Sequence, residues 1–282
     1  MDLINFVSQF NFQPDKSMLV GLERECHLVG ADGKIKPIAP TVLDYLWSSV
    51  NGRKDCYGYE LSACQFEERL EKPSKLSDAR KMMLANQADI TRDEKALGFK
   101  RAYYSVAPSD VPLDVFPVER YQRITRDMPF KTLHAACRVT GVHVLVGMPD
   151  KETALRVYNH VVGYYEDLCR IGHVKDGKMF WQTNKDCASP WQLDGYSVSE
   201  RLWLFKESGL VERFLPPRYD SWDDFFERAK HEGFVSDPRR LWDFIRISKH
   251  GAIEFRMFDT VEDLDIIFFW ANYCLNICQE VL

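Results

Sequence analysis

The stretch MLVGLERECHLV, residues 18–29, decides the fold of this chain. Its apolar and polar side chains alternate, which predicts a β-strand because successive side chains of a strand point to opposite faces. Glu23, Glu25 and His27 then share one face. An exposed edge strand with solvated glutamates is the alternative, but the apolar run at residues 19–22 favours a buried central strand.

A second stretch, IEFRMF at residues 253–258, repeats this pattern near the other end of the chain. It sets Glu254 and Arg256 against three apolar side chains on the opposite face. A cross-strand ion pair would explain these two residues alone. Carboxylates gathered on one sheet face, however, repel one another unless cations neutralise them, and Mg²⁺ carrying a nucleotide is a suitable neutraliser. The sequence therefore predicts an ATP- and magnesium-dependent enzyme.

Composition and charge narrow the class of protein. The chain has 282 residues, of which 45% are hydrophobic, so it can bury a large core. It has no linker composition and no internal repeat, which favours one catalytic domain over residues 1–282. The net charge is −5 without a basic stripe, which argues against nucleic acid as a partner. The N-terminus does not resemble a secretion signal, and the longest uncharged run, about 14 residues, is too short to span a membrane. We therefore expect a cytoplasmic protein with no membrane partner.

The order of the predicted elements favours an α+β fold, with a curved, mainly antiparallel sheet and helices packed on one face. Beyond residues 18–29, we expect strands at 59–68, 101–106, 137–148, 241–247 and 251–258. We expect helices at 77–97 with Ser77 as the cap, from the cap Asp150 to 169, and at 197–208, 221–231 and 263–282.

The last predicted helix is apolar on most sides, which is typical of a buried helix. It is either a central core helix or a contact with another subunit, so a homo-oligomer formed through this C-terminal helix is one expectation. The eight cysteines lack metal-binding spacing and are expected to be mostly buried thiols.

His143 lies in the otherwise apolar run TGVHVLVG, residues 140–147. A lone histidine there is either a satisfied core residue or, facing a carboxylate cluster, a metal ligand or phosphate contact. Glycine-rich phosphate loops and the zinc-protease and serine-hydrolase motifs are missing from the sequence. We therefore expect metals, arginine and lysine to hold any phosphate groups.

Several of these segments together resemble the glutamate–cysteine ligase superfamily, and in particular its type 2 carboxylate–amine ligase (YbdK-like) branch. The resemblance rests on GLERE at 21–25, the segment from Glu60 to Glu67, TGVHV at 140–144, and EFR at 254–256 with Asp259. Supporting matches are ERYQ at 119–122, MPDKETAL at 148–155 and LWDFIRIS at 241–248.

The resemblance implies a glutamine-synthetase-like fold and a specific reaction. ATP would phosphorylate a substrate carboxylate, an amine would attack the acyl phosphate, and ADP and phosphate would be released. The implied cofactors are ATP and Mg²⁺, with Mn²⁺ as an alternative, and the implied substrates are an amino acid or other carboxylate and an amine.

The resemblance also implies the site residues. The candidate metal ligands are Glu23, Glu25, Glu60, Glu67, His143 and Glu254. Arg256 corresponds to the arginine that contacts the γ-phosphoryl group and is the candidate catalytic residue. Arg246 and His143 are further candidate contacts to the nucleotide or substrate. One departure is Leu145, where this branch usually has a second histidine.

Two other functions are compatible with these residues. A guanidino-kinase-type phosphotransferase has a similar sheet architecture and would transfer phosphate without forming an amide. A non-catalytic nucleotide-binding protein would keep the site and lack the reaction. The loops at 31–58 and 177–220, where we expect specificity to lie, carry no readable motif for the substrates.

Overall fold

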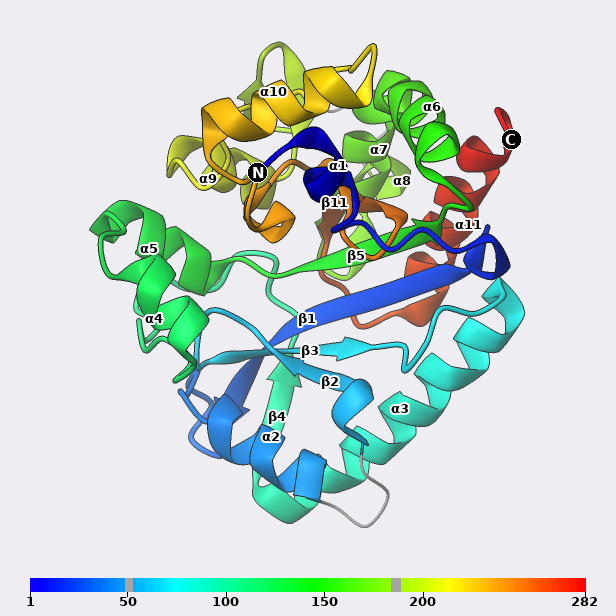
Figure 1. Ribbon diagram of the computed structural model, residues 1–282. Coiled ribbons are helices and arrows are strands. Elements are labelled where there is room, and N and C mark those ends of the chain that lie inside the picture. The colour runs from blue at the N-terminus through cyan, green and yellow to red at the C-terminus, as the bar shows by residue number, and fades with distance from the viewer. Residues whose placement is uncertain (49–52, 184–188) are drawn as a thin grey trace.

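The computed structural model describes residues 1–48, 53–183 and 189–282. Strand β1 (Val20–Gly30), predicted at residues 18–29, runs through the centre of an antiparallel sheet (Figure 1). Seven strands form this sheet in the order β10-β11-β5-β1-β3-β2, and β4 pairs with the second half of β1. The predicted α+β fold with an antiparallel sheet is confirmed.

The remaining strands of the sheet are β2 (Tyr57–Tyr59), β3 (Gln65–Arg69), β4 (Phe99–Ala102), β5 (Gly141–Gly147), β10 (Ile245–Ser248) and β11 (Ala252–Asp259). Two small hairpins pair β6 (Val174–Lys175) with β7 (Lys178–Met179) and β8 (Trp191–Leu193) with β9 (Tyr196–Val198).

The helices surround this sheet (Figure 1). They are α1 (Leu3–Val7), α2 (Ala39–Ser48), α3 (Leu76–Leu97), α4 (Glu119–Thr125), α5 (Phe130–Arg138), α6 (Lys151–Val161), α7 (Tyr165–Gly172), α8 (Phe180–Thr183), α9 (Glu200–Glu207), α10 (Trp222–Glu232) and α11 (Leu264–Gln279). Short 3₁₀ helices lie at Pro14–Lys16, Arg53–Asp55, Val162–Tyr164 and Pro238–Arg240.

The alternation in β1 separates two faces of the sheet. Leu22, Cys26 and Leu28 are buried on the face that the helices cover. On that side α3 and α11 pack against each other beside β1, and α6 and α7 contact β11 (Figure 1). The opposite face carries the glutamates; α9 covers it near Gly141, and α5 covers it at His27. Between these helices the second face borders a cavity, which is also lined by residues of α2 and α4.

Several element boundaries differ from the sequence predictions. Residues 59–68 form parts of two paired strands, β2 and β3, because the chain turns between them. The strand predicted at 101–106 lies earlier, at Phe99–Ala102. The strand predicted at 137–148 begins only at Gly141, since residues 130–138 form the unpredicted helix α5. The strand predicted at 241–247 begins at Ile245.

The helix predictions also need two corrections. Lys75, and not Ser77, stands at the N-cap of α3, and its side chain makes no capping hydrogen bond. The helix predicted from Asp150 to residue 169 is interrupted by the 3₁₀ turn at Val162–Tyr164. The predicted loop at 177–220 contains α9, within the helix predicted at 197–208, together with the unpredicted hairpin β8–β9.

Helix α11 is a core helix of this chain, as one of the two alternatives predicted. Trp270 is fully buried, stacks on Phe258 and donates a hydrogen bond to the carbonyl of Ile171. Phe269 is the large apolar side chain of α11 that remains exposed. No helix among the described residues is long and apolar enough to cross a membrane. Six of the seven described cysteines are buried, as predicted, and Cys187 lies outside the described residues.

Asp150 caps α6, as predicted, and its replacement tests that assignment. Its carboxylate accepts hydrogen bonds from the backbone N–H and the hydroxyl of Thr153, at 2.8 and 2.9 Å. Because the substitution leaves a helix N–H without its partner, Asp150→Ala should lower the free energy of unfolding by about 1 kcal/mol. Urea denaturation followed by circular dichroism measures this change. Asp150→Asn, which keeps an acceptor oxygen, should lose less; equal losses would contradict the capping role.

Candidate active site

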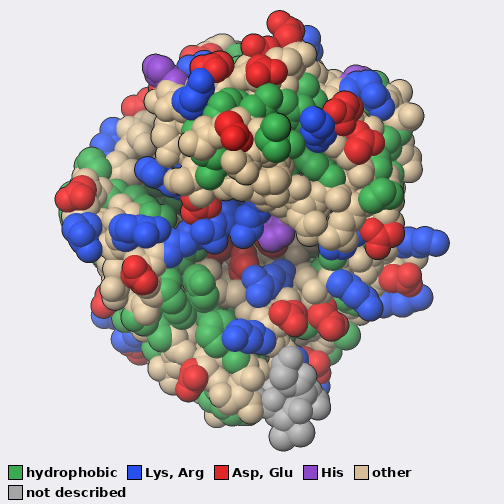
Figure 2. Space-filling view, in the orientation of Figure 1, with side chains coloured by type: hydrophobic (Ala, Val, Ile, Leu, Met, Phe, Trp, Pro, Cys, Tyr) green, Lys and Arg blue, Asp and Glu red, His purple; other side chains and the backbone are tan. Residues whose placement is uncertain are grey.

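A cavity of about 530 Å³ opens on the face of the sheet that carries the glutamates. Figure 2 shows a hollow with acidic side chains inside and basic side chains around its edge. Its lining includes every candidate site residue predicted from the sequence: Glu23, Glu25, Glu60, Glu67, His143, Arg246, Glu254 and Arg256. The chain thus brings distant acidic motifs into one hollow, while the roles of these residues remain predictions.

The strand register explains why these side chains meet. Glu23 of β1 lies opposite His143 of β5 on one side and Arg69 of β3 on the other. Glu25 lies opposite Glu67, again between β1 and β3. Because cross-strand partners project from the same face at close spacing, each pairing places two polar groups side by side.

Glu23, His143 and Glu254 form the tightest group. One ligand atom from each side chain lies within 4.8 Å of the others. His143 Nδ1 is 3.0 Å from a carboxylate oxygen of Glu23. Its Nε2 is 3.4 Å from Glu25 Oε1 but lacks hydrogen-bond geometry, so this buried nitrogen has no partner among the described residues. The donor set of two carboxylates and an imidazole suits a divalent cation such as Mg²⁺ or Mn²⁺.

Glu25 is fixed in position by the strand beside it. Its Oε2 accepts the backbone N–H of Gly141 at 2.7 Å, and its backbone carbonyl accepts the hydroxyl of Thr260 at 2.6 Å. Gly141 has no side chain because Arg201 of α9 packs directly on it, where a Cβ would overlap the guanidinium. This close approach leaves Glu25 Oε1 directed at His143.

Two arginines hold Glu254. Arg246 donates to both carboxylate oxygens, at 2.9 and 2.8 Å, and Arg256 donates to one of them at 2.6 Å. Burial alone would raise the pKa of Glu254, but Arg246 and Arg256 outweigh it and lower that pKa. A carboxylate has about four lone-pair positions, so three accepted hydrogen bonds leave about one for a cation. Glu254 is therefore ionised and can still serve as a ligand.

Glu60 and Glu67 form a second acidic pair in the cavity. Burial raises the pKa of Glu67 to about 8, and the charges of Glu23 and Glu25 add to this effect. Burial also raises the pKa of Glu60 well above its usual value, with Glu25 and Glu67 contributing. Arg69 pairs with Glu67 at 3.0 Å but does not cancel the repulsion. These carboxylates are crowded in a way that a bound cation would relieve.

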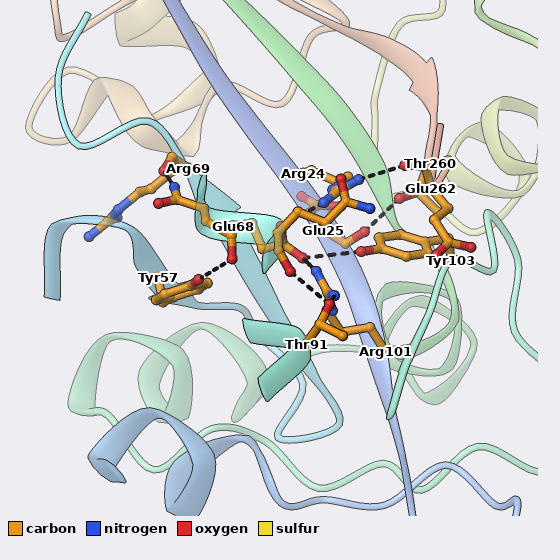
Figure 3. Close-up of polar contacts among 12 residues, drawn as sticks. Arg24, Glu25, Tyr57, Glu68, Arg69, Thr91, Arg101, Tyr103, Thr260 and Glu262 are labelled. Atoms are coloured by element: carbon orange, nitrogen blue, oxygen red, sulfur yellow. Dashed lines mark hydrogen bonds and ion pairs between the residues drawn. The ribbon is translucent and has the colours of Figure 1, made fainter. Parts of the chain in front are cut away.

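The opposite face of the sheet carries a compensated charge network (Figure 3). Glu68, fully buried, accepts hydrogen bonds from Arg24 at 2.6 Å, Arg101 at 2.5 Å and the hydroxyl of Tyr103 at 3.1 Å. Arg101 also pairs with Glu94 at 2.9 Å. Burial would raise the pKa of Glu68, but Arg24 and Arg101 lower it. Two arginines and two glutamates thus balance each other directly beneath the acidic face.

Asp259, another residue of the sequence motifs, lies outside the cavity lining. Its carboxylate accepts hydrogen bonds from the hydroxyl of Ser199 at 2.8 Å and the backbone N–H of Val174 at 3.1 Å. Burial raises its pKa to about 6 from an ordinary value of 3.8, although Arg201 acts in the other direction. This residue fixes the end of β11 to α9 and β6.

The raised pKa of Asp259 makes folding stability depend on pH. The folded protein keeps this proton up to about pH 6, whereas the unfolded chain releases it near pH 3.8. The stabilisation by protonated Asp259 is therefore fully present below pH 3.8 and is lost as pH rises through 6. A pKa difference of about 2 units corresponds to about 3 kcal/mol of unfolding free energy. The unfolding free energy of the wild type relative to Asp259→Asn should fall by this amount between pH 4 and pH 7. A difference that does not change with pH would contradict the assignment.

One residue on the predicted acidic face, His27, does not belong to the cavity. His27 is fully buried outside the cavity, where its Nε2 lies 3.1 Å from the carbonyl oxygen of Cys137. Burial lowers its pKa to about 4, so it is a neutral core histidine. Several basic and aromatic residues line the cavity without having been predicted: Trp47, Lys54, Tyr59, Arg69, Phe205, Arg239, Lys249 and His250. Arg120 and Tyr121 also line it, within the supporting ERYQ match.

Comparisons with known proteins agree with the resemblance seen in the motifs. No family model matches the chain. A curated relative from Leifsonia xyli named "Putative glutamate–cysteine ligase 2" is 24% identical over 268 residues, covering 92% of this chain and 66% of the relative. A protein of the same name from Clavibacter michiganensis is 31% identical over 131 residues, covering 45% of this chain and 30% of that protein. The chain thus spans two thirds or less of these relatives.

Two solved structures share the fold. A bifunctional glutathione synthetase from Pasteurella multocida matches 98% of this chain and 39% of its own, with a TM-score of 0.58 and 16% identity. A glutamate–cysteine ligase from Francisella tularensis in complex with AMP matches 95% of this chain and 68% of its own, with a TM-score of 0.50 and 15% identity. The chain is therefore similar in sequence to proteins named as ligases and similar in fold to two ligases.

Proposed function

We propose that this protein is an ATP-dependent carboxylate–amine ligase of the glutamate–cysteine ligase kind. One observation carries the proposal: separate strands bring Glu23, His143 and Glu254 together with two arginines in one cavity. This is the combination that phosphoryl transfer requires, because its transition state gathers negative charge on oxygens that cations must stabilise. The similarity to curated ligases supports the same class of reaction.

The cavity suits divalent cations and a nucleotide. Glu23, His143 and Glu254 would hold one cation, since a ligand atom of each lies within 4.8 Å of the others and Glu254 keeps about one free lone-pair position. Glu60 and Glu67 would hold another, because burial and the neighbouring carboxylates raise both pKa values and a cation would offset this. A bound Mg²⁺ would neutralise phosphate oxygens. Lys54, Arg239 and Lys249 at the cavity edge supply the further positive charge that a triphosphate requires.

In the proposed reaction, a carboxylate oxygen of the acid substrate forms a bond to the γ-phosphorus of ATP while the β–γ bridge breaks and ADP leaves. The amine nitrogen then bonds to the acyl carbon, phosphate leaves with the bonding electrons, and the amine proton passes to solvent. We propose that Arg256 and Arg246, which both donate hydrogen bonds to Glu254, also stabilise the phosphoryl oxygens. A cavity that excludes water protects the acyl phosphate from hydrolysis.

A substrate screen tests the proposal. Carboxylic acids and amines are mixed with ATP and Mg²⁺, and ADP release is measured together with the amide product by mass spectrometry. ADP that forms only when both an acid and an amine are present supports the ligase. AMP with pyrophosphate contradicts the acyl-phosphate route. A stable phosphorylated product indicates a guanidino-kinase-type enzyme, and nucleotide binding without turnover indicates a non-catalytic protein.

A cytoplasmic location and a homo-oligomer remain predictions from the sequence. Most of α11 is buried within the chain itself, so association through this helix would use exposed residues such as Phe269. Sedimentation of the wild type and of Phe269→Ser distinguishes a monomer from an oligomer that depends on this surface.

A further inference from the structure

A second cavity of about 290 Å³ adjoins the candidate active site. The two cavities share Glu23, Arg69 and His250 in their linings, so the second opens beside the proposed cation ligands. We call this second cavity the annex. Its lining has a different chemistry from that of the main cavity.

The floor of the annex is apolar because the strand pattern changes there. Leu145 lies opposite Gly21 of β1 on one side and Glu254 of β11 on the other. The next cross-strand pair on the same face joins two small residues, Gly147 and Ala252. A Cβ at Gly21 would lie 3.3 Å from Cβ of Leu145, so glycine keeps the space beside Leu145 open. The sheet therefore presents small and aliphatic groups directly beside its charged ones.

The rim of the annex carries charges of both signs. Lys16 lines it, as do Asp55 and Glu71. None of these three side chains forms an ion pair with another residue in the described ranges 1–48, 53–183 and 189–282. A cation and two carboxylates around an apolar floor match a zwitterion with an aliphatic group, because the ammonium and carboxylate meet opposite charges while the side chain leaves water.

We propose that the annex binds an amino-acid substrate through an aliphatic side chain that packs on Leu145. This inference rests on the proposed ligase function and names one substrate class for it. Leu145 then determines specificity, since a polar side chain that enters the annex loses its water and gains no partner from the floor. The strand register places Leu145 beside Glu254, close to where the acyl phosphate would form.

Leucine and asparagine form a matched pair of probes, because their side chains are similar in shape and differ in polarity. Calorimetry with Mg²⁺ and a non-hydrolysable ATP analogue measures the binding of each. The wild type should bind leucine about 10- to 100-fold more tightly than asparagine, as hydrophobic pockets discriminate by about this factor. Leu145→Asn should remove most of this preference, with nucleotide affinity unchanged. Leu215→Asn, at an exposed leucine, is the control and should keep the preference.

Leu145→Ala keeps the experiment informative if Leu145→Asn does not fold. Alanine enlarges the annex, so the preference should move from leucine toward phenylalanine. Turnover then identifies the role of the amino acid: N-acetylleucine can act only as the acid and leucinamide only as the amine, and ADP release with one of them shows which side the annex serves.

Failure of the annex and failure of the ligase are separable. If the wild type forms ADP with polar amino acids while leucine neither binds nor reacts, the annex proposal is overturned and the ligase stands. If leucine binds according to residue 145 but no acid–amine pair releases ADP, the annex remains as a binding site and the ligase function fails. An unchanged leucine-to-asparagine ratio in folded variants of Leu145 also overturns the annex.

Discussion

Arg256→Ala should lower kcat by about 10³-fold while the Kd for Mg–ATP changes by less than about 3-fold. Removing one preorganised donor to a developing oxyanion typically costs 10²–10³-fold, and an arginine on a transferring phosphoryl group costs 10³-fold or more. Nucleotide affinity should persist because Arg246 still pairs with Glu254 and the carboxylates are intact. Steady-state ADP release and calorimetry measure the two quantities separately.

The matched control for Arg256 is Arg126→Ala, which removes an exposed arginine after α4. It should leave kcat within about 2-fold, since surface substitutions rarely matter. Arg256→Lys keeps the charge and loses the planar fork, so it should recover only part of the rate. A wild-type kcat in Arg256→Ala would remove this residue from the proposed reaction.

Glu68→Ala should lower the free energy of unfolding by about 3–5 kcal/mol, the usual cost of leaving a buried charge without its partner. Arg24 would lose its 2.6 Å contact and Arg101 its 2.5 Å contact, and Arg24 is fully buried. Urea denaturation followed by tryptophan fluorescence measures the loss.

Glu166→Ala removes an exposed glutamate from α7 and serves as the control for Glu68. It should change the unfolding free energy by less than about 0.5 kcal/mol. A loss of less than about 1 kcal/mol in Glu68→Ala would mean that the two arginines find other partners, and the network would not be a stabilising feature of the sheet.

The central strands and the acidic side chains could be predicted because alternation in β1 and β11 is a local signal. The residues around Glu23 and Glu254 display it without knowledge of any partner strand. The same alternation implies that neighbouring residues of a strand point to opposite faces, so Glu67 and Glu68 lie on different sides of the sheet. Alternation within one strand does not show which strands pair with each other. The resemblance to known ligases was therefore needed to group His143 with Glu23.

The errors arose where an apolar run fits more than one kind of element. Residues 137–140 belong partly to α5 and partly to its link to β5, yet Val139 and Thr140 are β-branched and extend the β pattern of the strand backwards. The turn between β2 and β3 lies in a segment with no glycine or proline, so the hairpin was missed. Helix α6 ends in a 3₁₀ turn whose residues keep the helical period.

The annex could not be predicted because it depends on small residues that only the folded chain brings together. Gly21 and Ala252 contribute by the small size of their side chains, and they are far apart in the sequence. Gly147 instead makes room for the backbone of Lys16, which packs directly on it. The sequence marks Leu145 only as a departure from the second histidine usual in the branch, and does not show what the residue contacts. Only the register of three strands shows that it borders a hollow beside Glu254.

The opposed faces of β1 also have a consequence for how the sheet assembles. A slip of one residue would exchange the two sides of a strand. It would bury Glu23 and Glu25 in the hydrophobic core beneath α11. It would also turn the Arg24 guanidinium to the other face, away from Glu68. A misaligned pairing therefore costs the free energy of burying unpaired charges. The charges that would serve the reaction thus also select the correct register of the sheet that holds them.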